Sequence, residues 1–154
     1  MDPEFVRWTV DVPHPYAEAD ARSFVELADR AWDDGTRAVF AIADAETGSG
    51  LGVVDLHLDV RGEPGLASIG YWLLARARGR GLASRALRLL SRWALTELGV
   101  ERLYLTTAPD NVASQRVAER AGFTREGLLR AHLPTQAGRR DSVIFSLLPA
   151  DLDR

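Results

Sequence analysis

Residues 76–84 read Arg-Ala-Arg-Gly-Arg-Gly-Leu-Ala-Ser, between an apolar run (67–75) and a long amphipathic segment (82–98). This order predicts a strand, a tight turn and the start of a helix. Glycines let the backbone approach a ligand closely, and the free N–H groups at a helix start attract anions. The three arginines add positive charge. We interpret the turn as a cradle for a phosphate-bearing ligand, with a basic, solvated loop as the alternative.

The composition is that of one soluble globular domain. The chain has 154 residues, of which 46% are hydrophobic and 27% charged, in the ordinary range for such domains. No apolar run approaches the roughly 20 residues of a membrane helix, and no signal-peptide pattern opens the chain. We therefore expect a cytoplasmic protein without membrane contact.

Cysteine and histidine usage excludes several kinds of site. The chain has no Cys, so disulfides, thiolate nucleophiles and Cys-zinc sites are excluded. His14, His57 and His132 are far apart and lack metal-ligand spacing, so no metal is expected.

Charge is unevenly distributed along the chain. The formal net charge of −3 argues against nucleic-acid binding, yet residues 65–96 hold six arginines and no Asp or Glu. A local positive field on an acidic protein suits a small anion. The chain has no Lys and the turn lacks G-x-G-x-x-G, so a Walker loop and a dinucleotide-binding fold fit poorly.

Hydrophobic periodicity predicts three helices and six strands. The helix over 17–32 has a predicted apolar face that includes Val25 and Trp32, and Asp20 is expected to assist its start. Residues 6–15 read as an irregular segment. The other predicted helices span 82–98 and 111–121, and the predicted strands span 37–45, 51–60, 67–75, 100–107, 123–133 and 141–148.

The order of elements predicts one α+β (mixed α/β) domain over 1–154, with helices covering a largely antiparallel sheet. Residues 1–5, Met-Asp-Pro-Glu-Phe, are either native or a translated cloning site.

Three blocks resemble the GNAT N-acetyltransferases. Arg76-x-x-Gly79-x-Gly81-Leu-Ala matches the R/Q-x-x-G-x-G/A signature of this superfamily, and Ile69-Gly-Tyr-Trp-Leu is similar to the strand before it. The block from Asn111 to Gly127, and Pro13-x-Pro15-Tyr16 followed by Asp20-Ala21, resemble the branch with ribosomal-protein-alanine N-terminal acetyltransferases. The match runs over nearly the whole chain.

The resemblance implies acetyl-CoA as donor and a set of residues that hold it. Backbone N–H groups of the turn would bind the pyrophosphate, arginines would offset its charge, and the preceding strand would pair with pantetheine and stabilise the oxyanion. The residues implied are Trp72, Leu73, Leu74, Arg76, Arg78, Gly79, Arg80, Gly81, Leu82, Ala83, Ser84, Asn111 and Ser114.

The resemblance also implies catalytic and acceptor-binding residues. Ser114 is expected to protonate or hydrogen-bond the leaving thiolate; the plain alternative is a first-turn residue behind an Asn111 N-cap. Relatives often carry Glu where this chain has Ser68. His132 is therefore the first candidate base and His57 the second, and a water chain is a third possibility. Tyr16 and His57 are expected to line the acceptor site.

Two departures leave a second function open. Members of the family usually have a first strand and helix that this chain lacks, and Arg85 also replaces an expected Glu. An unpaired sheet edge invites a homodimer. The expected function is acetyl transfer from acetyl-CoA to a primary amine, on a protein N-terminus or a small molecule, by direct attack. The alternative is a CoA-binding or interaction module without turnover.

Overall fold

The computed structural model describes residues 2–9, 15–135 and 138–152. Its helices are α1 (Pro3–Trp8), α2 (Glu18–Asp33), α3 (Leu82–Glu97) and α4 (Val112–Arg120). Its strands are β1 (Arg37–Ala43), β2 (Gly50–His57), β3 (Leu66–Leu73), β4 (Arg102–Thr107), β5 (Thr124–Thr135) and β6 (Gly138–Leu147).

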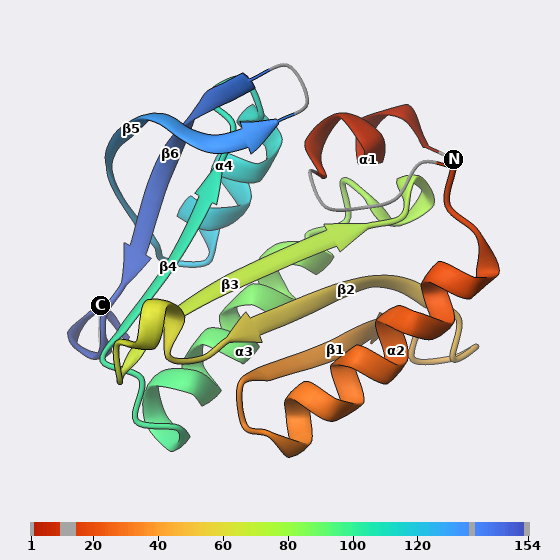
Figure 1. Cartoon of the computed structure of the whole chain (residues 1–154), viewed down its shortest axis with the longest axis horizontal. Coiled ribbons are helices and arrows are strands. Elements are labelled where there is room, and N and C mark those ends of the chain that lie inside the picture. The colour runs from red at the N-terminus through yellow and green to blue at the C-terminus, as the bar shows by residue number, and fades with distance from the viewer. Residues whose placement is uncertain (1, 10–14, 136–137, 153–154) are drawn as a thin grey trace.

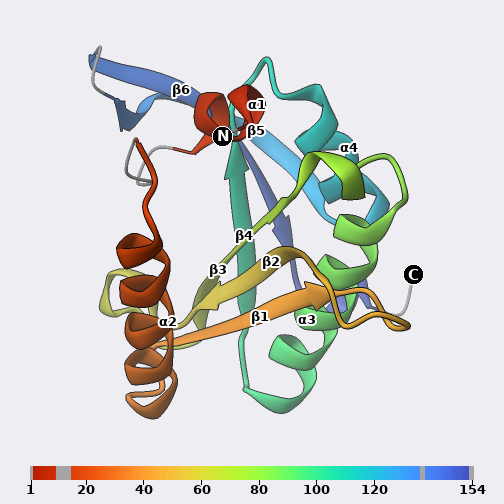
Figure 2. The same ribbon diagram turned by 90° about the vertical axis from the view of Figure 1, so that its right-hand side faces the viewer.

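The strands form one six-stranded sheet in the order β1-β2-β3-β4-β6-β5. β3 and β4 run parallel, and the other neighbouring pairs are antiparallel. α3 and α4 lie on one side of the sheet and α2 on the other, with α1 above the ends of the central strands (Figures 1 and 2). The predicted α+β architecture with a mostly antiparallel sheet is confirmed.

The hydrophobic core lies between α3 and the sheet. Leu56, Leu87, Leu103 and Phe145 are fully buried there, because alternate strand residues and the apolar stripe of α3 face each other. Each such side chain contributes roughly 1.5–3 kcal/mol through burial. This rigid layer holds the central strands in place beneath the site described below.

The two central strands separate over half of their length. β3 pairs with β4 only from Leu66–Ser68 to Arg102–Tyr104. Beyond this point β3 continues to pair with β2 up to Leu73, and β4 with β6 up to Thr107. The carboxyl ends of β3 and β4 therefore diverge in the middle of the sheet.

The predicted irregular segment over 6–15 is wrong for Val6–Trp8, which belong to α1. The Asp2 side chain accepts a hydrogen bond from the Glu4 N–H (3.0 Å), and Pro3 occupies the first helical position, which are ordinary signals of a helix start. Residues 10–14, with the predicted Pro13 turn, lie outside the described residues.

The predicted apolar face of α2 is only partly buried. Val25 is 57% and Trp32 53% exposed. Trp32 instead contacts Phe40 of β1 and Trp93 of α3, with ring centroids 5.9 and 6.5 Å apart. The start of α2 is as expected, because the Asp20 carboxylate accepts the Ala17 N–H (2.7 Å).

The strand predicted over 51–60 ends earlier, at His57. Asp59 and Arg61 adopt positive φ angles of 47° and 61°, which an extended strand does not permit.

Within the described ranges, every helix is too short or too polar to cross a bilayer.

Candidate active site

A cleft of about 760 Å³ opens where β3 and β4 diverge. Its walls come from the ends of these two strands, the start of α3, residues along the length of α4 and one side of α1. Leu133 and Arg140, from the β5–β6 hairpin, complete the lining. The cleft thus joins the two sequence blocks, 76–84 and 111–117, that carry the family resemblance.

The glycine turn leads directly into the start of α3. Gly79 and Gly81 both have φ of 74°, a conformation that favours glycine. α3 begins at Leu82 without a side-chain cap, and residues 81–84 line the cleft. The unused N–H groups and the positive end of the helix dipole therefore face the cavity, as an anion site requires.

The three arginines of the turn have different surroundings. Arg76 donates to the carbonyl of Gly50 (2.8 Å) and so ties the turn to β2. Arg80 is exposed and, like Arg76, does not line the cleft. Arg78 lines the cleft, with 32% of its side chain exposed. Only one arginine of the predicted cradle therefore reaches the cavity.

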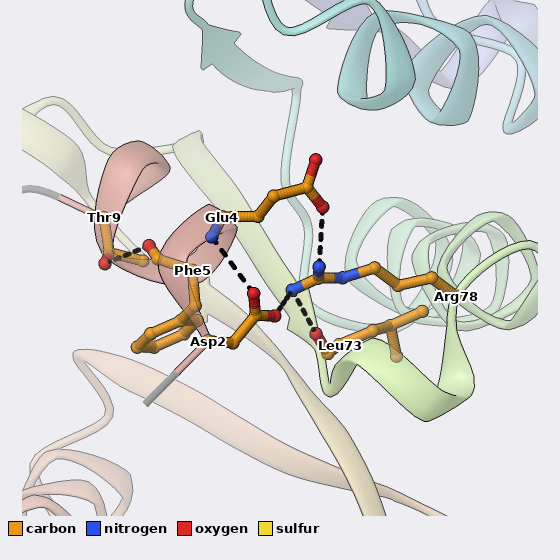
Figure 3. A network of polar contacts seen from close by, with 6 residues as sticks. All are labelled: Asp2, Glu4, Phe5, Thr9, Leu73 and Arg78. Atoms are coloured by element: carbon orange, nitrogen blue, oxygen red, sulfur yellow. Dashed lines mark hydrogen bonds and ion pairs between the residues drawn. The ribbon is translucent and has the colours of Figure 1, made fainter.

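Arg78 is held by α1 (Figure 3). Its guanidinium forms ion pairs with Asp2 and with Glu4 (2.7 Å) and donates to the Leu73 carbonyl (3.2 Å). Phe5 packs edge-on against Trp72, with centroids 5.1 Å apart. α1 is thereby fixed against the end of β3.

Of the three residues at the end of β3 and just after it that were predicted to contact pantetheine, two line the cleft and one does not. Trp72 and Leu73 line the cleft, whereas Leu74 does not. The Leu74 N–H donates to the Leu51 carbonyl (2.9 Å), so it is already used between β3 and β2.

Asn111 and Ser114 line the cleft at the start of α4. The Asn111 side-chain carbonyl accepts the Ser114 N–H (3.1 Å) and caps α4, and both residues line the cleft. Asn111 is therefore an N-cap residue that also faces the cavity.

Tyr71 is the principal site residue that the sequence analysis did not single out. Its hydroxyl donates to the Ser114 carbonyl (3.0 Å) and lies 2.9 Å from Ser114 Oγ. Burial raises the pKa of Tyr71 to about 12, against a smaller opposite effect of the hydrogen bond from Ser114, so the phenol keeps its proton at neutral pH. The sequence offers one indication of this role, which is the position of Tyr71 within the Ile69-Gly-Tyr-Trp-Leu block.

The residues predicted as bases or acceptor ligands lie elsewhere. His132 is absent from the cleft lining, where its neighbour Leu133 is present. Tyr16 is exposed and also outside the lining. His57 lines a second pocket of about 480 Å³ between α2 and the sheet.

His57 belongs to a polar cluster on the α2 side of the sheet. Its Nε2 lies 3.0 Å from Asp55 Oδ2, and Arg37 pairs with the same oxygen. Burial raises the pKa of Asp55, but hydrogen bonds from His57 and Arg37 outweigh it, so the pKa lies below its usual value. Asp55 is therefore a stable anion that fixes both neighbours.

Among the described residues, no three or more His, Cys, Asp or Glu side chains converge as a metal site would need. The cleft instead offers backbone N–H groups, arginines and hydroxyls, those of Tyr71 and Ser114 among them.

Comparison with known proteins identifies the family. Residues 1–124 match the model of the acetyltransferase (GNAT) domain. The chain belongs to the GNAT family. The resemblance inferred from its sequence blocks is thereby confirmed, and the GNAT signature is the same turn that leads into α3.

Two relatives and one solved structure place the chain within the family. It is 33% identical to the probable N-acetyltransferase YjcK of Bacillus subtilis over 73% of the chain and 62% of the relative. It is 37% identical to the putative ribosomal N-acetyltransferase YdaF of Bacillus subtilis over 66% of the chain and 55% of the relative. The matches therefore span between half and two thirds of these relatives.

The solved structure is the microcin C7 self-immunity acetyltransferase MccE in complex with acetyl-CoA and AMP. It superposes with a TM-score of 0.82 and 26% identity, covering 94% of this chain and 79% of that chain.

Proposed function

We propose that this chain transfers the acetyl group of acetyl-CoA to a primary amine by direct attack. The observation that carries the proposal is the cleft between β3 and β4, which meets the uncapped start of α3 at one end. A long donor with phosphates at one end and a thioester at the other suits this shape. The acetyl-CoA complex of the similar MccE supports the same donor.

The proposed donor contacts follow from the lining of the cleft. Backbone N–H groups of residues 79–84 receive the pyrophosphate, with Arg78 beside them. Pantetheine lies along the free part of β3, near Trp72 and Leu73, with Asn111 on the opposite wall. Leu74, Arg76 and Arg80 act on the turn or the surrounding charge, because they do not line the cavity.

The proposed reaction is one displacement at the thioester carbon. The amine nitrogen attacks the carbonyl, a backbone N–H of β3 stabilises the oxyanion, and the carbon–sulfur bond breaks. The sulfur leaves as a thiolate and takes a proton from Ser114, which is hydrogen-bonded to Tyr71. The attacking nitrogen, positively charged after addition, loses one proton to water, and water returns a proton to Ser114, whose hydroxyl the neutral phenol of Tyr71 holds in place.

In the proposed reaction, water accepts the proton that the acceptor amine loses before it attacks. The carboxylates that line the cleft, Glu4 and Asp110, are both paired with arginines. His132 and His57 lie outside the lining. The neutral fraction of the amine therefore reacts after its proton has passed to solvent.

The acceptor is a primary amine on a protein N-terminus or on a small molecule. YdaF bears the description of a putative ribosomal N-acetyltransferase, which supports the first kind. Location in the cytoplasm remains a prediction from composition.

The experiment replaces Leu82, the first residue of α3. Leu82→Glu adds a carboxylate where the pyrophosphate would bind, while an acidic residue in the first turn is favourable to the helix. Leu82→Gln is the neutral control of the same shape. Isothermal titration should find acetyl-CoA binding at least about tenfold weaker for the Glu variant than for the Gln variant.

A thiol-release assay over a panel of amines then separates the two functions. Acetylation requires CoA release that depends on the amine. Acetyl-CoA binding without release by any amine would favour the CoA-binding module instead. Equal binding by both Leu82 variants would place the donor elsewhere.

We also propose self-association through the sheet edge at β1. β1 is an edge strand of the sheet. It carries the exposed Phe40, which contacts the exposed Trp32 of α2. An edge strand next to exposed apolar side chains favours pairing with a second copy.

A further inference from the structure

Arg140 lies on a part of the cleft that the proposed donor does not need. Leu133 of β5 and Arg140 of β6 are directly opposed in the hairpin register, so their side chains share one face. Both line the cleft. The hairpin and α1 lie at the same end of the molecule in both views (Figures 1 and 2).

This placement bears on the acceptor if the proposed function is correct. With the donor phosphates at the start of α3, the thioester would lie between β3 and β4. The acceptor would then enter between the hairpin and α1, so Arg140 would be at its point of entry.

The side chain of Arg140 has no partner within the described residues. Arg140 forms no ion pair there, and its Nε is buried without a hydrogen bond. Leaving a buried donor of a charged group unsatisfied is costly. A ligand that accepts hydrogen bonds would satisfy it.

The other charged side chains of the cleft do not provide a hydrogen-bond acceptor for Arg140. Its two carboxylates are already paired: Asp110 with Arg7 (2.8 Å) and Glu4 with Arg78 (2.7 Å). Arg116 and Arg120 also line the cleft, but they come from α4, on the donor's side of the sheet. An anion on the hairpin side would therefore meet Arg140 first.

We propose that Arg140 binds a carboxylate of the acceptor, so that the preferred substrate is a primary amine that also carries a carboxylate. A planar guanidinium can donate two parallel hydrogen bonds to such a group. Leu133 packs beside the carbon chain of the acceptor. The carboxylate then fixes one end of the molecule while its amine reaches the thioester between the strands.

The test uses acceptor pairs that differ only in carboxylate and carboxamide. One pair is phenylalanine and phenylalaninamide, with the charge next to the amine. The other is glutamyl-alaninamide and glutaminyl-alaninamide, with the charge on a peptide side chain. The wild-type chain should have the higher kcat/KM for the acid of at least one pair. A preference in the first pair would indicate a free amino acid as acceptor, and a preference in the second pair would indicate an acidic peptide.

Arg140→Gln should remove this preference. We expect kcat/KM for the preferred acid to fall about tenfold to a hundredfold, as for loss of a charge-assisted hydrogen bond, and that for its amide to change less than about threefold. Acetyl-CoA affinity should stay unchanged. Arg130→Gln, an exposed position on β5 outside the cleft, is the matched control.

Three results would overturn the assignment. They are a wild-type preference for the amides, an equal loss for acid and amide in Arg140→Gln, and the same loss in Arg130→Gln. Failure of the proposed function would look different, because no acceptor would then release CoA from the wild-type chain.

Discussion

At the scale of single residues, the contact between Tyr71 and Ser114 is the most specific feature of the cleft. Their hydroxyl oxygens are 2.9 Å apart, and the Tyr71 hydroxyl also donates to the Ser114 carbonyl. Tyr71→Phe removes both hydrogen bonds but keeps the ring. We expect kcat to fall by about tenfold or more, because the thiolate loses a supported proton donor, and the acetyl-CoA affinity to stay within about threefold.

Steady-state kinetics and titration of acetyl-CoA check this prediction. Tyr104→Phe, on β4 and outside the cleft lining, is the control and should leave kcat unchanged. If the two hydroxyls act as a unit, combining Tyr71→Phe with Ser114→Ala should cost little more than Ser114→Ala alone. An unaltered kcat in Tyr71→Phe would leave Tyr71 a purely structural role.

At the scale of elements, α1 and its N-cap residue occupy the guanidinium of Arg78 and would compete with the proposed donor for it. Asp2 and Glu4 hold the guanidinium that the proposed pyrophosphate site would use (Figure 3). The double variant Asp2→Asn, Glu4→Gln frees this charge. Partly exposed ion pairs contribute little to stability, so we expect acetyl-CoA to bind only about two- to fivefold more tightly.

Titration at low and high salt distinguishes this effect from a change in folding. The gain should shrink in about 1 M salt, where surface charges are screened. Glu18→Gln, which breaks the exposed pair with Arg22 on α2, should change nothing. Weaker binding by the double variant would mean that α1 positions Arg78 for the donor. Both carboxylates fall within residues 1–5, so the result also measures what that stretch adds.

At the scale of the whole molecule, the sequence predicted the elements better than their contacts. Alternation and helical periodicity were enough to locate the six strands and α3, most clearly for β4 and α3, which bury a regular face against the core. The sequence analysis does not predict α1 although Asp2 and Pro3 signal a helix start, because residues 1–5 also read as a translated cloning site. The exposed Trp32 was misjudged because periodicity cannot tell a core from a sheet edge.

The site was predicted where it depends on local sequence and missed where it depends on register. The glycine turn and the Asn111 cap are local, and the sequence located both. Tyr71 and Ser114 are 43 positions apart, and Arg140 enters the cleft only through its pairing with Leu133. Neither contact has a signature in a single sequence. The arginines of the turn looked equivalent, because spacing alone does not tell which guanidinium turns inward.

The free edge at β1 gives a prediction for the assembly. We expect a homodimer at micromolar concentration, measured by size-exclusion chromatography with light scattering. Trp32→Arg should weaken it at least about tenfold, because Trp32 is 53% exposed beside the edge and tryptophans often dominate interface energies. Val112→Arg, at a 51% exposed position on α4, adds the same charge away from β1 and should leave the dimer intact. A monomer at all concentrations tested would mean that the Trp32, Phe40 and Trp93 rings protect the edge by themselves.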